Sequence, residues 1–271
     1  MDNYTYAVDL ASRLTKDFRG SLLDYGCGAG QIVEKALAAG YDAYGVDEFY
    51  DGGSYREDAK RNGLLQTRIF ELQNGQIPFS DESFDVIVSN QVFEHIADFS
   101  LPLAEIDRVL KPTGIFINIF PSSESWREGH IGIPFAHWWP KGSSLRSSYV
   151  LLLRSIGMGY FKGNKSAKQW TSDQLEWIDK WTHYKSLAEI KNEFERYFTV
   201  SCNETDYMLT LINGCPRLQL FSGLFETSII QKILRFICYK YASRVFILKK
   251  RKESSADGRI KAISAHCETI E

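Results

Sequence analysis

The sequence lacks the features of several large classes of protein. None of its five cysteines forms a C-x-x-C pair, so neither a zinc site nor a disulfide framework is indicated, and we expect no metal. It contains no uninterrupted apolar run of about 18 residues, so a membrane-spanning helix is not expected. The formal net charge is only −2, so the overall charge gives no reason to expect a nucleic-acid partner.

The N-terminus, MDNYTYAVDL, has no basic region followed by an apolar stretch, so no signal peptide is expected. Together with the cysteine pattern, this favours an intracellular, cytoplasmic location. A chain of 271 residues can bury a full core. We predict a single domain over residues 1–252 and a polar tail at 253–271.

The sequence does contain a strand, glycine turn, helix and strand over residues 22–47. A short apolar strand ends at Asp24, apolar residues recur with helical spacing after the turn, and a second strand ends at Asp47. The turn has glycines at alternate positions, namely Gly26, Gly28 and Gly30. Glycines let a backbone approach a ligand closely, and a helix N-terminus presents free N–H groups. The unit therefore predicts a nucleotide-type site.

The spacing of the glycines distinguishes between ligands. The dinucleotide fingerprint G-x-G-x-x-G fits a pyrophosphate, whereas this chain has G-x-G-x-G. Gln31 stands where the third glycine of the dinucleotide pattern would fall. The spacing therefore argues against an NAD-type oxidoreductase, which we keep as an alternative.

Three ordered motifs resemble those of the class I S-adenosylmethionine-dependent methyltransferases. The first is DYGCGAG at residues 24–30, followed by Asp47. The runs at 77–96 and 105–121 are similar to the small-molecule, type 11 branch of that family. The resemblance implies an α/β fold with a doubly wound, mostly parallel seven-stranded sheet, and S-adenosylmethionine as the cofactor.

The resemblance also implies roles for the residues around the glycine turn. Asp24 would hold the amino group of the methionine part of the donor. The three glycines would bring backbone close to the ligand. Asp47, followed by Glu48, would accept both ribose hydroxyls.

Two further turns complete the implied donor site. Gln73 or Asn74 would meet the adenine amine, at a place where the family often has Asp. Both side chains are amides that can donate and accept hydrogen bonds. Asn90, next to Gln91, would close the site on the methionine side at the end of a buried strand.

The acceptor site is less clearly marked. Residues 121–170 form a long stretch rich in Pro, Gly and aromatic residues, which we interpret as an acceptor-binding cap; the alternative is an extra structural subdomain. Histidine titrates near working pH, so His130 and His137 are candidate catalytic bases, or else simply hydrogen-bonded loop histidines. His95 follows Glu94 in a pair that is frequent in the family and suggests a scaffold role.

A second, helical insertion is expected at about 207–241, and residues 206–209 are expected to be extended. A basic amphipathic helix over 228–252 could lie on an anionic membrane surface, or it could pack over the acceptor pocket. The N-terminal segment 5–18 is expected to be a helix packed on the sheet or a lid carrying Tyr4 and Tyr6.

These observations favour an S-adenosylmethionine-dependent methyltransferase that acts on a small-molecule or glycan-like acceptor, with a weak preference for oxygen. The alternatives are an NAD-type oxidoreductase and a non-catalytic module that binds S-adenosylmethionine. The oligomeric state is left open.

Overall fold

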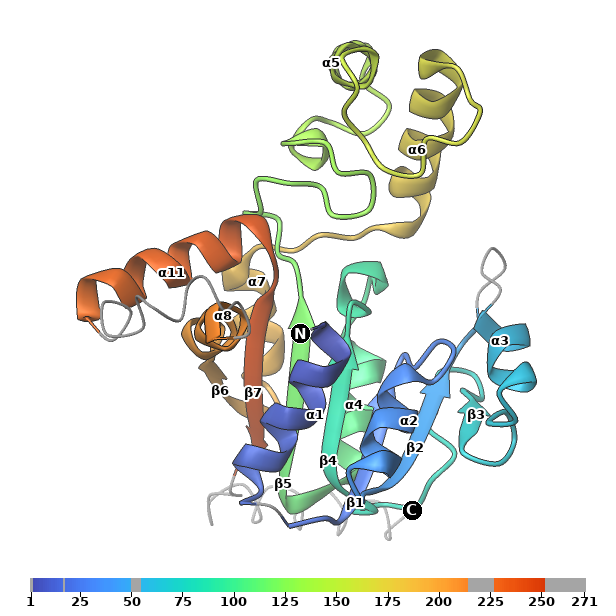
Figure 1. Ribbon diagram of the computed structural model, residues 1–271. Coiled ribbons are helices and arrows are strands. Elements are labelled where there is room, and N and C mark those ends of the chain that lie inside the picture. Colours follow the sequence, from blue (N-terminus) through green and yellow to red (C-terminus); the bar gives the residue numbers. More distant parts are fainter. Residues whose placement is uncertain (1, 17, 50–54, 214–226, 252–271) are drawn as a thin grey trace, which may run out of the picture.

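The architecture comes from a computed structural model, which describes residues 2–16, 18–49, 55–213 and 227–251 (Figure 1). One seven-stranded sheet has the order β3-β2-β1-β4-β5-β7-β6. β7 runs antiparallel to β5 and β6, and the other pairs are parallel. The predicted mostly parallel, seven-stranded sheet is therefore confirmed.

The strands are β1 (Ser21–Tyr25), β2 (Asp42–Asp47), β3 (Ile69–Glu71), β4 (Phe84–Asn90), β5 (Leu110–Phe120), β6 (Phe198–Cys202) and β7 (Arg244–Lys250). The helices are α1 (Asn3–Leu14), α2 (Gln31–Ala38), α3 (Tyr55–Arg61), α4 (Ser100–Val109), α5 (Ser144–Ser155), α6 (Ala167–Trp181), α7 (Leu187–Phe194), α8 (Glu204–Asn213) and α11 (Ser228–Tyr241). Two short 3-10 helices are η1 (Phe93–His95) and η2 (Ala136–Trp138).

The sheet has a separate hydrophobic core on each face. Successive side chains of a strand point to opposite faces, so Leu22 joins one core and Leu23 joins the other. α1 and α2 cover the first face, and α4 and α7 cover the second. Because both faces are covered, the middle of β4, residues 86–88, is continuously apolar.

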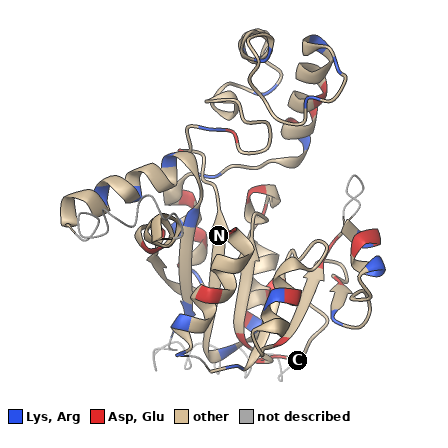
Figure 2. Cartoon of the chain, in the orientation of Figure 1, with Lys and Arg blue, Asp and Glu red and all other residues tan. Residues whose placement is uncertain are grey.

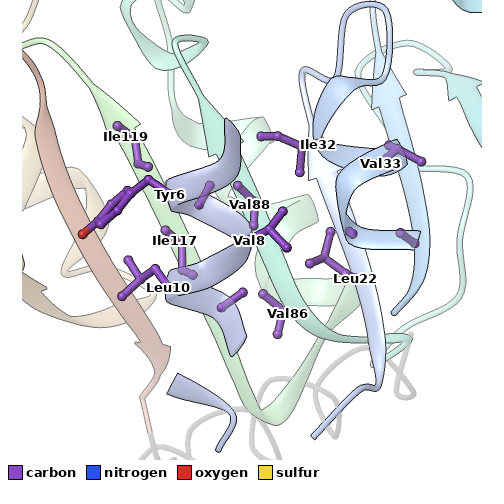
Figure 3. Close-up of a cluster of buried hydrophobic side chains, with 14 of the residues drawn as sticks. Tyr6, Val8, Leu10, Leu22, Ile32, Val33, Val86, Val88, Ile117 and Ile119 are labelled. Atoms are coloured by element: carbon purple, nitrogen blue, oxygen red, sulfur yellow. The ribbon is translucent and has the colours of Figure 1, made fainter. Parts of the chain in front are cut away.

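The N-terminal helix α1 packs on the sheet. Figure 3 shows Tyr6, Val8 and Leu10 against side chains of β4 and β5. The Tyr6 hydroxyl donates to Asp206 at 2.9 Å, so Tyr6 faces α8. Tyr4 lines a cavity described below. The packed-helix interpretation is therefore confirmed, and of the two tyrosines expected at the pocket mouth only Tyr4 lies there.

The expectation that residues 206–209 are extended was wrong, because they lie inside α8. Contacts with α1 explain the difference. Asp206 accepts hydrogen bonds from Tyr6 and Arg13, and the Tyr6 and Tyr207 rings meet edge to face at 4.7 Å. These partners lie about 200 residues away in sequence, where local patterns cannot reveal them.

The segment between β5 and α7 extends beyond the carboxyl ends of the parallel strands (Figure 1). It contains η2, α5 and α6, and it has its own core around Ile131, Val150 and Trp170. Arg146 of α5 is buried and pairs with Asp179 of α6, which ties the two helices together. The segment therefore packs around a hydrophobic core of its own. We call it the cap, and its role in acceptor binding stays a prediction.

The basic helix expected at 228–252 is shorter than predicted, because this segment consists of two elements. Its helical part, α11, ends at Tyr241, and the rest of its described residues lie mainly in β7. α11 carries an exposed apolar stripe that includes Ile229 (74% exposed) and Ile233 (51% exposed). Lys and Arg lie along the same helix in Figure 2, while charges of both signs are scattered over the rest of the molecule.

Among the described residues, no helix combines the length and apolar character needed to cross a bilayer. The expected tail at 253–271 lies outside the described residues.

Candidate functional site

A cavity of about 710 Å³ opens at the carboxyl ends of β1, β2 and β4. Ligands of open parallel sheets bind at this edge. Eight of the predicted donor-site residues line the cavity: Asp24, Gly26, Gly28, Asp47, Glu48, Asn74, Asn90 and Gln91. The structure thus brings together residues that are up to 67 positions apart in sequence.

The glycine turn is fixed against β2. The N–H groups of Gly26 and Cys27 both donate to the Val46 carbonyl, at 2.8 and 3.1 Å. Gly26 has φ +77°, and a Cβ there would overlap Val92. Gly30 does not line the cavity; it is the N-cap of α2, with φ +93°, and a Cβ would press on Leu64 and Ile69. Gly30 therefore shapes the turn without facing the cavity.

Asp47 stands at the end of β2 and is tied to that turn. Its Oδ2 accepts from the Gly28 N–H at 2.8 Å, and its Oδ1 accepts from the Phe49 N–H at 2.8 Å. A carboxylate offers about four lone-pair positions, so each oxygen can accept a further hydrogen bond from a ligand.

Asp24 ends the central strand and is only 2% exposed. Burial raises the pKa of this carboxyl well above its usual value, and the nearby Asp47 raises it further. Among the described residues, no Lys, Arg or His forms a salt bridge with Asp24. A ligand that carries a positive charge would supply the missing partner.

Of the two residues predicted to contact the adenine, only Asn74 lines the cavity. Gln73 and Gln76 exchange two backbone hydrogen bonds of 3.0 Å around a tight turn, and Gln73 does not line the cavity. Asn74, at the tip of this turn with φ +53°, does line it. The turn therefore presents Asn74 and Gly75 to a ligand.

Asn90 and Gln91 follow the end of β4. The Oδ1 atom of Asn90 is buried and has no hydrogen bond partner within the described residues. Gln91 adopts φ +58°, and its Nε2 donates to the Ser243 hydroxyl at 2.9 Å. Asn90 therefore keeps a free acceptor at the cavity, while Gln91 links the cavity to the start of β7.

The two predicted catalytic histidines lie apart. The His130 ring packs against His95, with 5.0 Å between the ring centroids, and His95 lines the donor cavity. His137 instead lines a second cavity of about 370 Å³ beside Tyr184 and Arg146. Neither His130 nor His137 lines the larger cavity.

The chemical settings of these two histidines also differ. Burial alone would lower the pKa of His130, but its hydrogen bond to the buried Glu128 carboxylate raises it. Burial lowers the pKa of His137, and its ring nitrogens are buried without a hydrogen bond partner in the described part of the chain.

Sequence reasoning missed several residues that line the cavity. Gln31 was noted only for its place in the glycine pattern, although as the first residue of α2 it sits where a helix N-terminus meets a ligand. Val92 lies next to the predicted pair at 90–91. Trp181, at the end of α6, comes from the cap, and no sequence signal connects it to this edge of the sheet.

The lining fits an adenosyl sulfonium donor. Within the described residues, the buried carboxylate of Asp24 has no cationic partner and the Oδ1 atom of Asn90 has no hydrogen bond partner, and the turn at Gly26 has no room for a side chain. These features suit an amino group, a further donor group and close backbone approach, respectively.

Comparison with known proteins agrees with this geometry. Residues 23–118 match the family model described as a methyltransferase domain. They form a class I S-adenosylmethionine-dependent methyltransferase domain of the type 11 branch. The match spans β1 to β5 and so includes most of the residues that line the cavity.

Two relatives are named ubiquinone biosynthesis O-methyltransferase. The protein from Paramagnetospirillum magneticum is 28% identical over 144 residues, covering 51% of this chain and 56% of that protein. The protein from Bartonella bacilliformis is 26% identical over 137 residues, covering 45% of this chain and 50% of that protein. The chain thus spans about half the length of these curated relatives.

The fold of this methyltransferase domain is also seen in a solved structure. An S-adenosylmethionine-dependent methyltransferase from Mesorhizobium loti superposes with a TM-score of 0.51 at 16% identity. The superposition covers 92% of this chain and 100% of that one.

Proposed function

We propose that the protein transfers a methyl group from S-adenosylmethionine to an oxygen of a small-molecule acceptor. The observation that carries this proposal is the pair of carboxylates, Asp24 and Asp47, on either side of the glycine turn in one cavity. The relatives named as O-methyltransferases support the choice of oxygen.

The donor supplies a methyl group that is already activated by a positive sulfur, so the protein has mainly to bind and orient. Asp24 binds the amino group, Asp47 the ribose hydroxyls and Asn74 the adenine. Asn90 and Gln91 close the methionine side. Holding the acceptor oxygen close to the methyl group and in line with it contributes several kcal/mol to catalysis.

The acceptor is proposed to enter from the cap side, where Trp181 and His95 line the cavity. A hydroxyl of a small molecule or of a glycan fits this proposal. His130, which packs on His95, is a better candidate than His137 for acting on that hydroxyl. Single-turnover rates of His130→Ala and His137→Ala test this order: equal rates would contradict it.

We also propose peripheral contact with an anionic membrane surface through α11. Ile229 and Ile233 form an exposed apolar stripe, and Lys232 lies between them in sequence. In helices that bind an anionic membrane surface, the apolar residues enter the lipid interface and the basic residues attract the anionic headgroups.

The methyl-transfer proposal is tested by release of S-adenosylhomocysteine in the presence of hydroxyl-bearing acceptors, from phenols to oligosaccharides. Product formation with at least one acceptor supports the proposal. Donor binding without turnover across the panel would favour a non-catalytic binding module. Binding of NAD in place of the donor would favour an oxidoreductase.

A further inference from the structure

Three potential metal ligands meet at the base of the cap. Ligand atoms of Glu94, His95 and His130 all lie within 4.8 Å of one another. Glu94 and His95 belong to η1, just after β4, whereas His130 comes from the cap segment 35 residues later. The fold therefore brings one carboxylate and two imidazoles to one point.

The Glu94 carboxylate is buried without compensation. Its side chain is 1% exposed, and neither Oε1 nor Oε2 has a hydrogen bond partner in the described part of the chain. A buried carboxylate without hydrogen bonds or a cation is strongly disfavoured. Two imidazoles beside it are not themselves a permanent charge, so the cluster lacks a stable positive partner.

Both imidazoles are held by their Nδ1 atoms. The Nδ1 of His95 lies 2.7 Å from the Trp181 carbonyl, which can only accept, so this nitrogen carries the proton. The Nδ1 of His130 lies 2.8 Å from the Glu128 carboxylate, which also accepts a hydrogen bond from Tyr184. These hydrogen bonds leave Nε2 of each ring to act as a ligand. Metal-binding histidines have this arrangement, with the far nitrogen donating to a carbonyl or carboxylate.

We propose that Glu94, His95 and His130 bind one divalent transition-metal ion, with Glu128 and the Trp181 carbonyl orienting the two rings. Two imidazoles and one carboxylate suit zinc, cobalt or a similar ion, whereas magnesium prefers oxygen ligands alone. Metal–ligand bonds of about 2.0–2.2 Å require the three side chains to draw slightly closer than they stand here.

The three metal ligands leave room for a further ligand from outside the protein. Three protein ligands leave the fourth position of a tetrahedral ion to water or substrate. His95 lines the donor cavity, so this position lies near that cavity. A role in binding the acceptor oxygen rests on the proposed methyl transfer, whereas metal binding itself does not. With the ion bound, His130 would act on an acceptor hydroxyl through the metal and not as a free base.

The experiment uses the full chain after dialysis against a chelator, with no methyl donor or acceptor present. Cobalt is added as a visible-absorption probe, and zinc is titrated by calorimetry. We expect about one ion per chain and d–d bands of a low-coordinate cobalt site. Glu94→Gln and His130→Ala should weaken zinc binding at least 100-fold, and Glu128→Gln should weaken it by about 10- to 100-fold.

The matched control is His137→Ala, which removes a half-buried cap histidine outside the cluster and should leave zinc affinity unchanged. Circular dichroism of each variant shows whether it is folded. The proposal is overturned if the wild type takes up no ion, or if a folded Glu94→Gln or His130→Ala variant binds zinc as tightly as the wild type. Because no donor is present, failure here is distinct from failure of methyl transfer.

Discussion

Asp24 and Asp47 carry the account at the scale of single residues, and they do so in different ways. Asp47 is held by two backbone N–H groups, so its carboxylate is positioned before any ligand arrives. Asp24 is buried and uncompensated, so it destabilises the empty protein and becomes favourable only beside a cation. One residue supplies geometry and the other supplies charge selectivity.

Replacing Asp47 by Asn is expected to weaken donor binding by about 10- to 100-fold, the effect of losing one hydrogen bond to a charged group. The amide NH₂ would have to face the N–H of either Gly28 or Phe49. The measurement is calorimetric titration with S-adenosylhomocysteine. The control Asp42→Asn lies on the same strand at its exposed start and should bind normally. Equal affinities of the two variants would contradict the role of Asp47.

Replacing Asp24 by Asn is expected to stabilise the donor-free protein while weakening donor binding. The pKa of Asp24 is raised in the folded state, so the folded protein holds this proton more tightly than the unfolded chain. Stability from this group is therefore present at low pH and is lost as pH rises above its unfolded pKa of about 3.9.

The melting temperature of Asp24→Asn minus that of the wild type should therefore become larger as the pH rises from 4 to 8. The temperature shift produced by S-adenosylhomocysteine should shrink in the variant. A variant that melts below the wild type at pH 8 would show that Asp24 is not an uncompensated buried charge.

At the scale of elements, the glycine turn and α11 make separate predictions. Gly26 and Gly63 both have positive φ, +77° and +71°. A Cβ at Gly26 would overlap Val92, whereas nothing lies within 4 Å of one at Gly63. Both positions therefore carry backbone strain for alanine, but only Gly26 adds a steric clash.

Gly63→Ala should cost about 1 kcal/mol of unfolding free energy through backbone strain alone. Gly26→Ala should cost a further 1–3 kcal/mol because Val92 must move. Urea denaturation of both variants measures the difference. If the two losses were the same, the turn would not be closely packed against η1.

α11 is expected to bind vesicles that contain anionic lipid. Ile233→Asp should reduce co-sedimentation several-fold, because it puts a negative charge into the exposed apolar stripe. The control Phe18→Asp changes another exposed apolar residue, in the loop before β1, and should sediment like the wild type. No binding of the wild type to anionic vesicles would remove the membrane proposal.

Elements that interact locally could be predicted, and those shaped by distant contacts could not. The strand–turn–helix–strand unit at residues 22–47 could be predicted, because its alternate glycines and the spacing of its apolar residues lie within one short stretch. Residues 206–209 were wrongly expected to be extended, because the partners that hold them in α8, Tyr6 and Arg13, lie in α1. The position of His130 beside His95 depends on how the cap folds back, which the spacing along the chain does not reveal.

In the whole molecule, the sheet and the cap contribute different residues to the cavity and its surroundings. The strand ends carry the predicted donor-binding residues, and the cap adds Trp181 to the cavity and brings His130 against His95. The donor side was therefore readable from sequence motifs. The acceptor side depends on the packing of α5 and α6, for which the sequence has no comparable motif.

The most direct test of the central claim is a crystal structure of the protein with S-adenosylhomocysteine. We expect the ribose hydroxyls within hydrogen-bond distance of the Asp47 carboxylate and the amino group beside Asp24, with Asn74 near the adenine. A ligand seated elsewhere, or a ribose far from Asp47, would contradict it.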